Sequence, residues 1–290
     1  MIRFSTATML PGALLLAGLA GCSEPPPEAG PDYWAGPTGT WQEVYRDDFD
    51  GPAGTAANAS SWNESVIGAP FNQELEYYTN RPDNLMLDGA GDLVITARSE
   101  YFVDASGVTS KQPYTSGRLD TLGHVEPQYG RIEARIKVPA GKGLWPAFWL
   151  LGKNFDSVGW PACGEIDILE MRGSAPNAIT GSLHGPGYAD TTPFSGTFTL
   201  PTGTFADDFH VFALEWTADG MRWLVDEQPY GWRTPQGLAN QYSTWIFDQP
   251  MYMILNLAVG GIFDGDPNAS TPMPAQMLVD YVKVSQLNPT

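Results

Sequence analysis

The chain reads Gly130-Arg131-Ile132-Glu133-Ala134-Arg135-Ile136-Lys137-Val138, a stretch in which charged and apolar side chains alternate with a period of two. Neighbouring side chains of a β-strand point to opposite faces, so this period puts the apolar residues on one face and the charged residues on the other. One face in the core and one in water is typical of a strand in an antiparallel sheet. The stretch therefore predicts a half-buried antiparallel strand.

Other segments on both sides of this stretch have the same β-strand character. They are rich in β-branched and aromatic residues, and turn residues such as Asp219 and Gly220 separate them. We predict strands over 93–98, 209–216, 221–226, 251–259 and 277–284. No segment with helical periodicity lies between them. Many short strands without intervening helices predict an all-β fold, a sandwich of two antiparallel sheets.

The composition is that of a folded and strongly acidic protein. Hydrophobic residues make up 42% and aromatic residues 12%, which is enough to bury a large core and excludes global disorder. Only 17% of residues are charged, and 32 Gly and 25 Pro argue against a helical bundle. The net charge of −18 repels phosphate and no basic run is present, so we expect no nucleic-acid partner.

The N-terminal residues are typical of an export signal rather than of a folded domain. Arg3 precedes an apolar stretch over 10–20 that is shorter than the roughly 20 residues a membrane-spanning helix needs. The stretch ends in Leu19-Ala20-Gly21-Cys22, which resembles the lipobox of bacterial lipoproteins, where cleavage before the cysteine frees a thiol for lipid attachment. The alternative is an ordinary cleaved signal followed by a chance cysteine.

We therefore predict three parts, with a lipoprotein signal peptide over 1–21, a Pro-rich linker over 22–38 that is lipid-anchored at Cys22, and a single domain over 39–290. Three consecutive prolines make the linker an extended spacer. These parts place the protein in the bacterial cell envelope, held to a membrane by its anchor and expected to be a monomer. With Cys22 acylated, the only other cysteine, Cys163, has no partner for an intramolecular disulfide. We expect its thiol to be inert, since no cation lies near it in the sequence.

The segment 164–170 carries three acids on what reads as a strand. Glu165 and Asp167 share one face, but strict alternation would turn Glu170 into the core, where an unpaired carboxylate costs several kcal/mol. A β-bulge at Ile168 and Leu169 adds one residue and returns Glu170 to the acidic face. The sequence therefore predicts a bulged strand with three carboxyl groups on one face.

Glycoside hydrolysis needs such a row, because it uses one ionised carboxylate and one protonated carboxylic acid beside the scissile bond. Neighbouring carboxyl groups push their pKa values apart, which divides these roles. A solvated outer face and a calcium site are the structural alternatives. The aromatic surroundings, with Trp160 just before the strand, argue against both.

The segment 164–170, Gly-Glu-Ile-Asp-Ile-Leu-Glu, resembles the catalytic motif of glycoside hydrolase family 16 in the bulged form found in its laminarinases. Supporting stretches lie in the same order at 114–118, 143–151, 183–188 and 256–261, so the resemblance extends over nearly the whole domain. It implies a β-jelly-roll, concanavalin A-like, with a concave substrate cleft. It also implies a retaining endo-hydrolase of β-1,3-glucans, with a β-glucan as its partner and no cofactor for catalysis.

The resemblance assigns a role to each acid. Glu165 would be the nucleophile, Glu170 the general acid and then base, and Asp167 would hydrogen-bond Glu165. The carboxyl groups of a retaining pair should lie about 5–5.5 Å apart. Because strand geometry alone separates the two positions further, the bulge and the long glutamate side chains must close this gap.

The resemblance also implies a set of sugar-binding residues. Two tryptophans four positions apart would share the sheet face and stack on sugar rings, although core packing is the alternative for each. The remaining positions match polar or aromatic residues of the family. The set is Asn84, Arg118, Trp145, Trp149, Trp160, His184 and Asn256.

Family members often carry a structural calcium away from the catalytic residues. The matching positions are Asp48, Gly91 through its carbonyl, and Asp280. Asp48 stands where a glutamate is expected, which shortens the reach, so an Asp-rich turn without metal is the alternative.

Several rival functions are left open by the residues. A non-catalytic β-glucan-binding lipoprotein would lack the two glutamates that are present here. Mixed-linkage glucan, agar or another galactan could replace the β-1,3-glucan, although the bulged motif argues against the unbulged mixed-linkage type. Transglycosylation uses the same residues, with a sugar hydroxyl in place of water.

Overall fold

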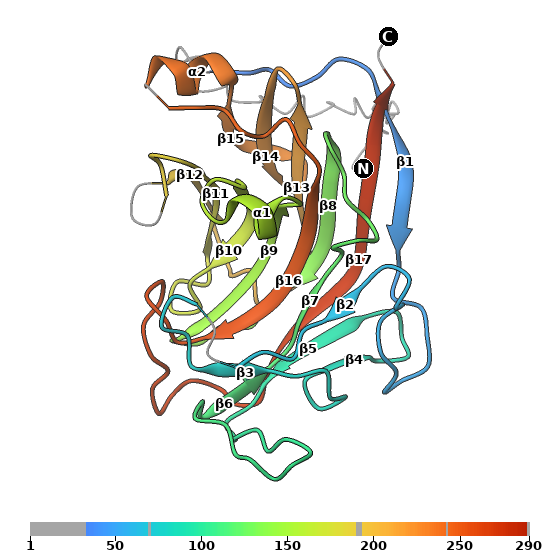
Figure 1. The fold of residues 1–290 in the computed structure, drawn as a ribbon, viewed down its shortest axis with the longest axis vertical. Coiled ribbons are helices and arrows are strands. Elements are labelled where there is room, and N and C mark those ends of the chain that lie inside the picture. The colour runs from blue at the N-terminus through green and yellow to red at the C-terminus, as the bar shows by residue number, and fades with distance from the viewer. Residues whose placement is uncertain (1–32, 69–70, 190–192, 242, 289–290) are drawn as a thin grey trace, which may run out of the picture. The chain divides into compact units, whose positions relative to one another are not determined.

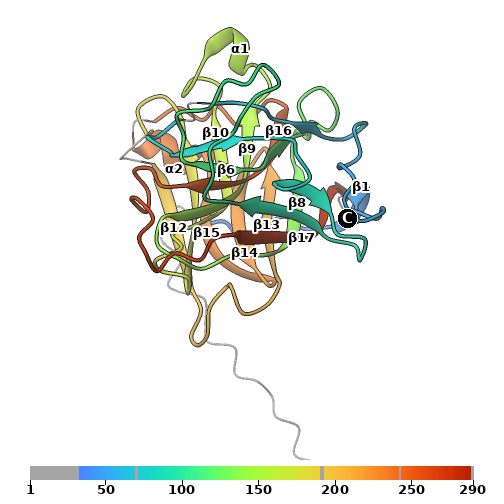
Figure 2. The same ribbon diagram turned by 90° about the horizontal axis from the view of Figure 1, so that it is seen from below.

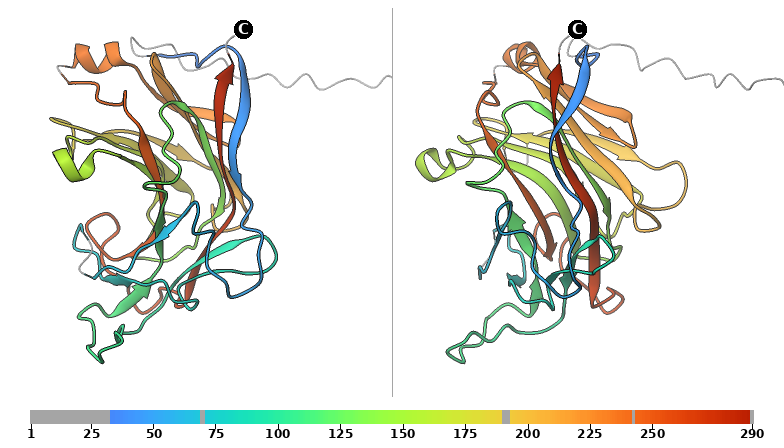
Figure 3. Two further views of the ribbon diagram at one scale, coloured as in Figure 1. Left: turned by 45° about the vertical axis from the view of Figure 1, so that its right-hand side comes forward. Right: turned by 90° about the vertical axis from the view of Figure 1, so that its right-hand side faces the viewer.

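The structure is a computed structural model that describes residues 33–68, 71–189, 193–241 and 243–288. Its strands form two large antiparallel sheets that lie as two layers (Figures 2 and 3). The predicted all-β sandwich is confirmed. The predicted signal peptide, Cys22 and most of the linker lie outside the described residues, so these parts of the domain prediction stay predictions.

The first sheet has eight strands in the order β15-β14-β13-β8-β17-β5-β4, and β1 pairs with the C-terminal part of β17 (Figure 1). Its strands are β1 (Thr40–Asp47), β4 (Leu85–Leu87), β5 (Leu93–Ala97), β8 (Gly130–Lys137), β13 (His210–Thr217), β14 (Gly220–Val225), β15 (Gln228–Arg233) and β17 (Ala275–Asn288). Five of the strands predicted from the sequence, among them the stretch quoted first, fall in this sheet within a few residues of their expected bounds.

The second sheet has seven strands in the order β12-β11-β10-β9-β16-β7-β2. They are β2 (Asn63–Glu64), β7 (Arg118–Asp120), β9 (Leu144–Gly152), β10 (Glu165–Met171), β11 (Ala178–His184), β12 (Phe194–Thr199) and β16 (Met251–Val259). A further pair, β3 (Glu76–Tyr78) and β6 (Tyr114–Ser116), is parallel.

Helix within the described residues is limited to α1 (Phe155–Val158) and α2 (Pro235–Asn240). Thr234 caps α2, since its hydroxyl accepts the N–H of Gly237 at 3.0 Å, and Pro235 fits the first turn. None of the helices in this part of the chain has the length and apolar character to cross a membrane.

The core lies between the two sheets. The eight-stranded sheet contributes Ile132 and Leu214, and the seven-stranded sheet contributes Phe148 and Ile166, all of which are fully buried in one hydrophobic cluster. Burying each such side chain stabilises the fold by about 1.5–3 kcal/mol. Apolar contacts between the inward faces therefore hold the two sheets together.

The charged face of β8 is less exposed than its pattern predicts. Arg131 and Glu133 are only 7% and 3% exposed. The Arg131 guanidinium bonds the carboxylates of Glu133, Glu215 and Glu227, and the ammonium of Lys283 lies 2.7 Å from Glu133. The expectation of a water-facing side is wrong here because paired opposite charges can be buried together.

Candidate active site

The bulge predicted in β10 is confirmed. The register with β9 shifts between Asp167 and Leu169, and the register with β11 shifts between Asp167 and Glu170. Ile168 and Leu169 are both buried in the core, which two successive residues of a regular strand could not achieve. Glu170 therefore returns to the outer face of the seven-stranded sheet, where Glu165 and Asp167 also lie.

The opposite sheet holds the bulge in place. Trp223 of β14 donates its indole N–H to the backbone carbonyl of Asp167 at 2.8 Å. Gly181 of β11 leaves room for this indole, since a Cβ there would lie 2.5 Å from Trp223 Cδ1. The sequence did not single out Trp223, because a tryptophan on the inward face of a strand is expected only to pack in the core.

His184 links the first two acids. Its Nε2 lies 3.0 Å from Asp167 Oδ2 and 3.6 Å from Glu165 Oε1. Asp167 thus hydrogen-bonds His184 through one oxygen, and the bond between Asp167 and Glu165 that the resemblance implies stays a prediction. Trp160, which is 38% exposed, hydrogen-bonds Glu165, and its ring centroid lies 6.1 Å from that of His184.

Glu170 has a different environment from Glu165. The indole N–H of Trp145 donates to Glu170 Oε1 at 3.0 Å. Burial, and after it the charge of Asp167, raises the pKa of Glu170 to about 8. A glutamic acid that stays protonated at neutral pH can donate its proton to a leaving oxygen.

Glu165 and Asp167 titrate together. Burial raises the pKa of both groups to about 8, and the charge of Asp167 adds to the rise at Glu165. The neighbouring His184 lowers the pKa of Glu165. A nucleophile must be ionised, so the reaction requires that a proton shared by these groups lies on Asp167 and not on Glu165.

Trp149 pairs with Asp167 in the register of β9 and β10 and therefore lies on the same sheet face, where it forms a platform with Asn256 and Arg118. Trp149 of β9 donates its indole N–H to Asn256 Oδ1 at 2.8 Å. The guanidinium carbon of Arg118 lies 5.0 Å from the centroid of the Trp149 ring, and Arg118 pairs with Asn256 in the register of β7 and β16. The side chain of Trp149 is only half-buried, so part of its ring faces out of the sheet.

Comparison with known proteins places this arrangement in a family. The family description "Glycosyl hydrolases family 16" matches residues 72–283. The chain belongs to glycoside hydrolase family 16. A "Beta-glucanase" of Rhodothermus marinus is 38% identical over 94% of this chain and 93% of its own length, and a "Glucan endo-1,3-beta-glucosidase" of Cryptopygus antarcticus is 39% identical over 84% and 92%. The solved endo-beta-1,3-glucanase of Pyrococcus furiosus is 44% identical over 87% of this chain and 97% of that one, with a TM-score of 0.80.

The family 16 relatives also include a protein named "Beta-1,3-glucan-binding protein" from Penaeus monodon, 38% identical over 64% of this chain. The family therefore covers proteins named for binding as well as for hydrolysis. Whether this chain hydrolyses glucan therefore depends on its own catalytic acids, Glu165 and Glu170.

One residue predicted to bind sugar lies elsewhere. Asn84 is fully buried and precedes β4 in the other sheet. Its amide donates to Thr96 O at 3.0 Å and Thr115 Oγ1 at 2.9 Å, while its oxygen accepts from Thr79 and Arg81. The prediction is wrong because these protein partners use the donors and acceptors that a sugar would need.

The residues predicted to bind calcium make contacts of their own in the structure. Asp48 and Gly91 do approach each other, since a Cβ on Gly91 would lie 3.9 Å from Asp48 O. Their predicted partner Asp280, however, accepts a hydrogen bond from Arg135 at 2.6 Å, and the carboxylate of Asp48 lies 2.6 Å from Arg46. Each carboxylate pairs with an arginine through one oxygen, so a calcium ion would have to compete with these arginines, and the calcium site stays a prediction.

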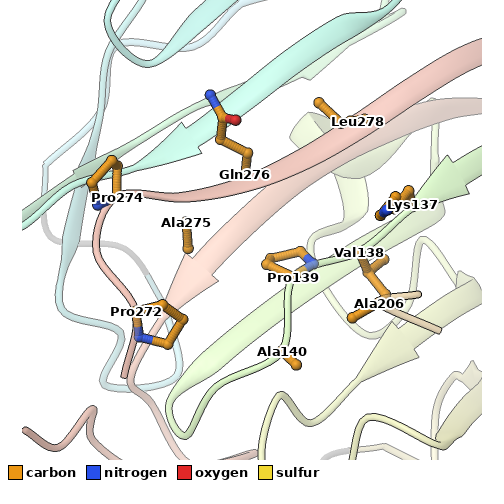
Figure 4. Close-up of a pocket in the computed structure, with 10 residues that line it drawn as sticks. All are labelled: Lys137, Val138, Pro139, Ala140, Ala206, Pro272, Pro274, Ala275, Gln276 and Leu278. Atoms are coloured by element: carbon orange, nitrogen blue, oxygen red, sulfur yellow. The ribbon is translucent and has the colours of Figure 1, made fainter. Parts of the chain in front are cut away.

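Two other features lie outside the catalytic chemistry. Cys163 is fully buried, and burial together with the charge of Glu165 raises the pKa of its thiol to about 11, so the thiol is unreactive as predicted. A hollow of about 340 Å³ lies beside the end of β8 and the start of β17 in the other sheet (Figure 4). Of the ten residues that line this hollow, only Lys137 is ionisable. The hollow therefore offers no pair of groups for acid–base catalysis.

Proposed function

We propose that this protein is a retaining endo-hydrolase of β-1,3-glucosidic linkages in laminarin-like β-glucans. One observation carries the proposal, the bulge that brings Glu165, Asp167 and Glu170 to the same outer sheet face. The relatives named as endo-1,3-beta-glucanases or glucosidases support the substrate class. The presence of both glutamates argues against a protein that only binds glucan.

The reaction proceeds in two displacements. In the first, the Glu165 carboxylate attacks the anomeric carbon while Glu170 gives its proton to the glycosidic oxygen, so the bond to the leaving sugar breaks and a glycosyl ester forms on Glu165. In the second, the Glu170 carboxylate takes a proton from water, and the water oxygen attacks the anomeric carbon. The ester bond then breaks and the configuration at this carbon is retained.

The surrounding side chains support these steps. Asp167 and His184 border the carboxylate of Glu165 and hold a proton close to it, which keeps the nucleophile charged. The Trp145 indole orients the Glu170 carboxyl group. Trp149 offers an apolar ring face to the C–H groups of a glucose residue, while hydroxyl groups can bond to Arg118 and Asn256.

A substrate panel with product sizing tests the proposal. We expect laminarin and curdlan to be cut internally into short oligosaccharides, lichenan to be cut more slowly, and agarose and carrageenan to be left intact. Proton NMR of the first products should show the β-anomer before mutarotation. Cleavage of agarose alone, or release of the α-anomer, would refute the substrate or the mechanism.

We also propose that the domain is a monomer tethered to the cell envelope by lipid on Cys22. The lipobox-like sequence and the proline-rich segment that follows support this tether. Fractionation of cells tests it, since Cys22→Ala should move the protein from the membrane fraction to the soluble fraction. Membrane retention of this variant would contradict a lipid anchor at this residue.

A further inference from the structure

A second pair of carboxyl groups lies near the predicted sugar platform, outside the catalytic set. Glu76 of β3 is fully buried, and its Oε2 accepts the backbone N–H of Val259 at 2.7 Å. Its other oxygen, Oε1, is also buried. In the described part of the chain, no N–H or O–H group donates a hydrogen bond to it. Burying a carboxylate oxygen without a hydrogen-bond donor costs free energy. This oxygen therefore indicates that a neighbouring group carries a proton and donates it.

Glu74 is the group that can supply this proton. Its side chain hydrogen-bonds Glu76. Two carboxyl groups can share a hydrogen bond only if one of them carries a proton, since an ionised carboxylate is an acceptor alone. Burial raises the pKa of both groups, and the proximity of Glu74 raises that of Glu76 further. These shifts agree with the shared proton that contact between two carboxyl groups requires.

The pair connects to Trp149 through two further side chains. The hydroxyl of Tyr78, a fully buried side chain, accepts the Asn256 amide at 3.1 Å, and burial, followed by the charges of Glu76 and Glu74, raises the pKa of this hydroxyl well above its usual value. Asn256 in turn accepts the indole N–H of Trp149 at 2.8 Å. The amide of Asn256 is fixed in this chain, because its oxygen faces an N–H group and its nitrogen faces a hydroxyl oxygen.

Two observations place the pair beside the substrate rather than in the core. Gly261 lies between Glu74 and Trp145, the tryptophan that donates to Glu170, since a Cβ on this glycine would lie 3.2 Å from Glu74 Cγ and 3.5 Å from Trp145 Cζ3. The charged groups that face the pair are the guanidinium of Arg118 on β7, which favours the ionised form of Glu74, and the ionisable hydroxyl of Tyr78 on β3. Arg118 also lies over the Trp149 ring.

We infer that Glu74 and Glu76 share one proton and act as a positioning pair, which holds Trp149 in its glucan-binding orientation through Tyr78 and Asn256. The inference rests on the proposed glucanase function. It predicts that loss of this proton weakens glucan binding more than it slows bond cleavage. Without the proton, the two carboxylates would face each other beside the Tyr78 hydroxyl. Their repulsion would disrupt the hydrogen bonds that lead through Asn256 to Trp149.

Two substitutions at Glu74 provide the test, with laminarin as substrate. Glu74→Leu removes the donor. We expect KM to rise about tenfold, which corresponds to the loss of one buried hydrogen bond, and kcat to fall by much less. Glu74→Gln keeps a donor in the same place and should restore most of the affinity. In the wild type KM should rise on the alkaline side, and in Glu74→Gln this rise should be absent.

An infrared difference spectrum gives a readout that does not depend on turnover. The wild type minus Glu74→Gln should show the carbonyl band of a protonated carboxyl group at neutral pH. An absent band, or a Glu74→Leu variant with the wild-type KM, would overturn the inference while leaving the glucanase proposal intact. A wild type that cleaves no laminarin would refute the glucanase proposal, and the band would still decide whether the proton is shared.

Discussion

Replacement of Trp223 by Phe tests whether the bulge in β10 is held by the opposite sheet. The phenyl ring keeps an aromatic side chain in the core but cannot donate to the carbonyl of Asp167, which now receives the indole N–H at 2.8 Å. A buried carbonyl that loses its partner costs about 1–3 kcal/mol. The free energy of unfolding should therefore fall by about this amount, measured by urea denaturation.

The effect on activity should exceed what this loss of stability explains. The freed carbonyl belongs to the residue at which the register shifts, between Glu165 and Glu170. A displacement of a catalytic group by about 1 Å can lower the rate a hundredfold, so kcat on laminarin should fall about 10- to 100-fold in a protein that is still folded.

Trp216→Phe is the matched control. Trp216 on the adjacent strand β13 is also fully buried, and its indole N–H donates to the carbonyl of Phe247 at 3.0 Å, away from the bulge. We expect a similar loss of stability with kcat nearly unchanged. If the two variants lose the same fraction of kcat, the argument that Trp223 positions the acids is refuted.

Four further outcomes are expected. Glu165→Gln should abolish release of reducing ends from laminarin and leave glucan binding largely intact, since the amide keeps the shape of the side chain but is no nucleophile; normal turnover would exclude Glu165 as the nucleophile. Trp149→Ala should weaken glucan binding with little change in Tm, whereas a large drop in Tm would show that this indole serves mainly the core. Because Glu170 acts first as an acid and its pKa is raised to about 8, kcat/KM should hold up to that pH and fall above it; a decline that is complete by pH 6 would contradict the role. Burial alone would raise the pKa of Glu133, but hydrogen bonds from Lys283 and a neighbouring arginine outweigh burial and lower it. The stabilisation that Glu133 contributes is therefore present above its pKa in the unfolded chain and is lost as the pH falls through its pKa in the folded protein. Glu133→Gln should flatten the acid side of the curve of unfolding free energy against pH, and an unchanged curve would contradict this.

The sequence predicts those parts of the fold that follow from side-chain alternation. The alternating stretch over 130–138 fixes which face of β8 is buried, and the phase conflict at Ile168 and Leu169 predicts the bulge, because only an extra residue keeps Glu170 out of the core. Both are local arguments about neighbouring residues. The bulge is confirmed, and so is the apolar face of β8, whereas the charged face of β8 is more buried than alternation predicts.

What the sequence could not predict depends on contacts between distant segments. Trp223 reaches the Asp167 carbonyl across 56 positions, and Asn84 is fixed by Thr115 from another strand. The burial of Arg131 likewise needs Glu215 from β13. Alternation tells which face a side chain lies on, but it does not tell which segment covers that face.

Covalent trapping tests the central claim most directly. A fluorosugar substrate, such as a 2-fluoro laminaribiosyl fluoride, slows the second displacement and lets the glycosyl ester accumulate for peptide mapping by mass spectrometry. The account predicts that the label is found on Glu165. A label on Asp167 or Glu170, or rapid turnover of the reagent with inversion of configuration and no trapped ester, would contradict it.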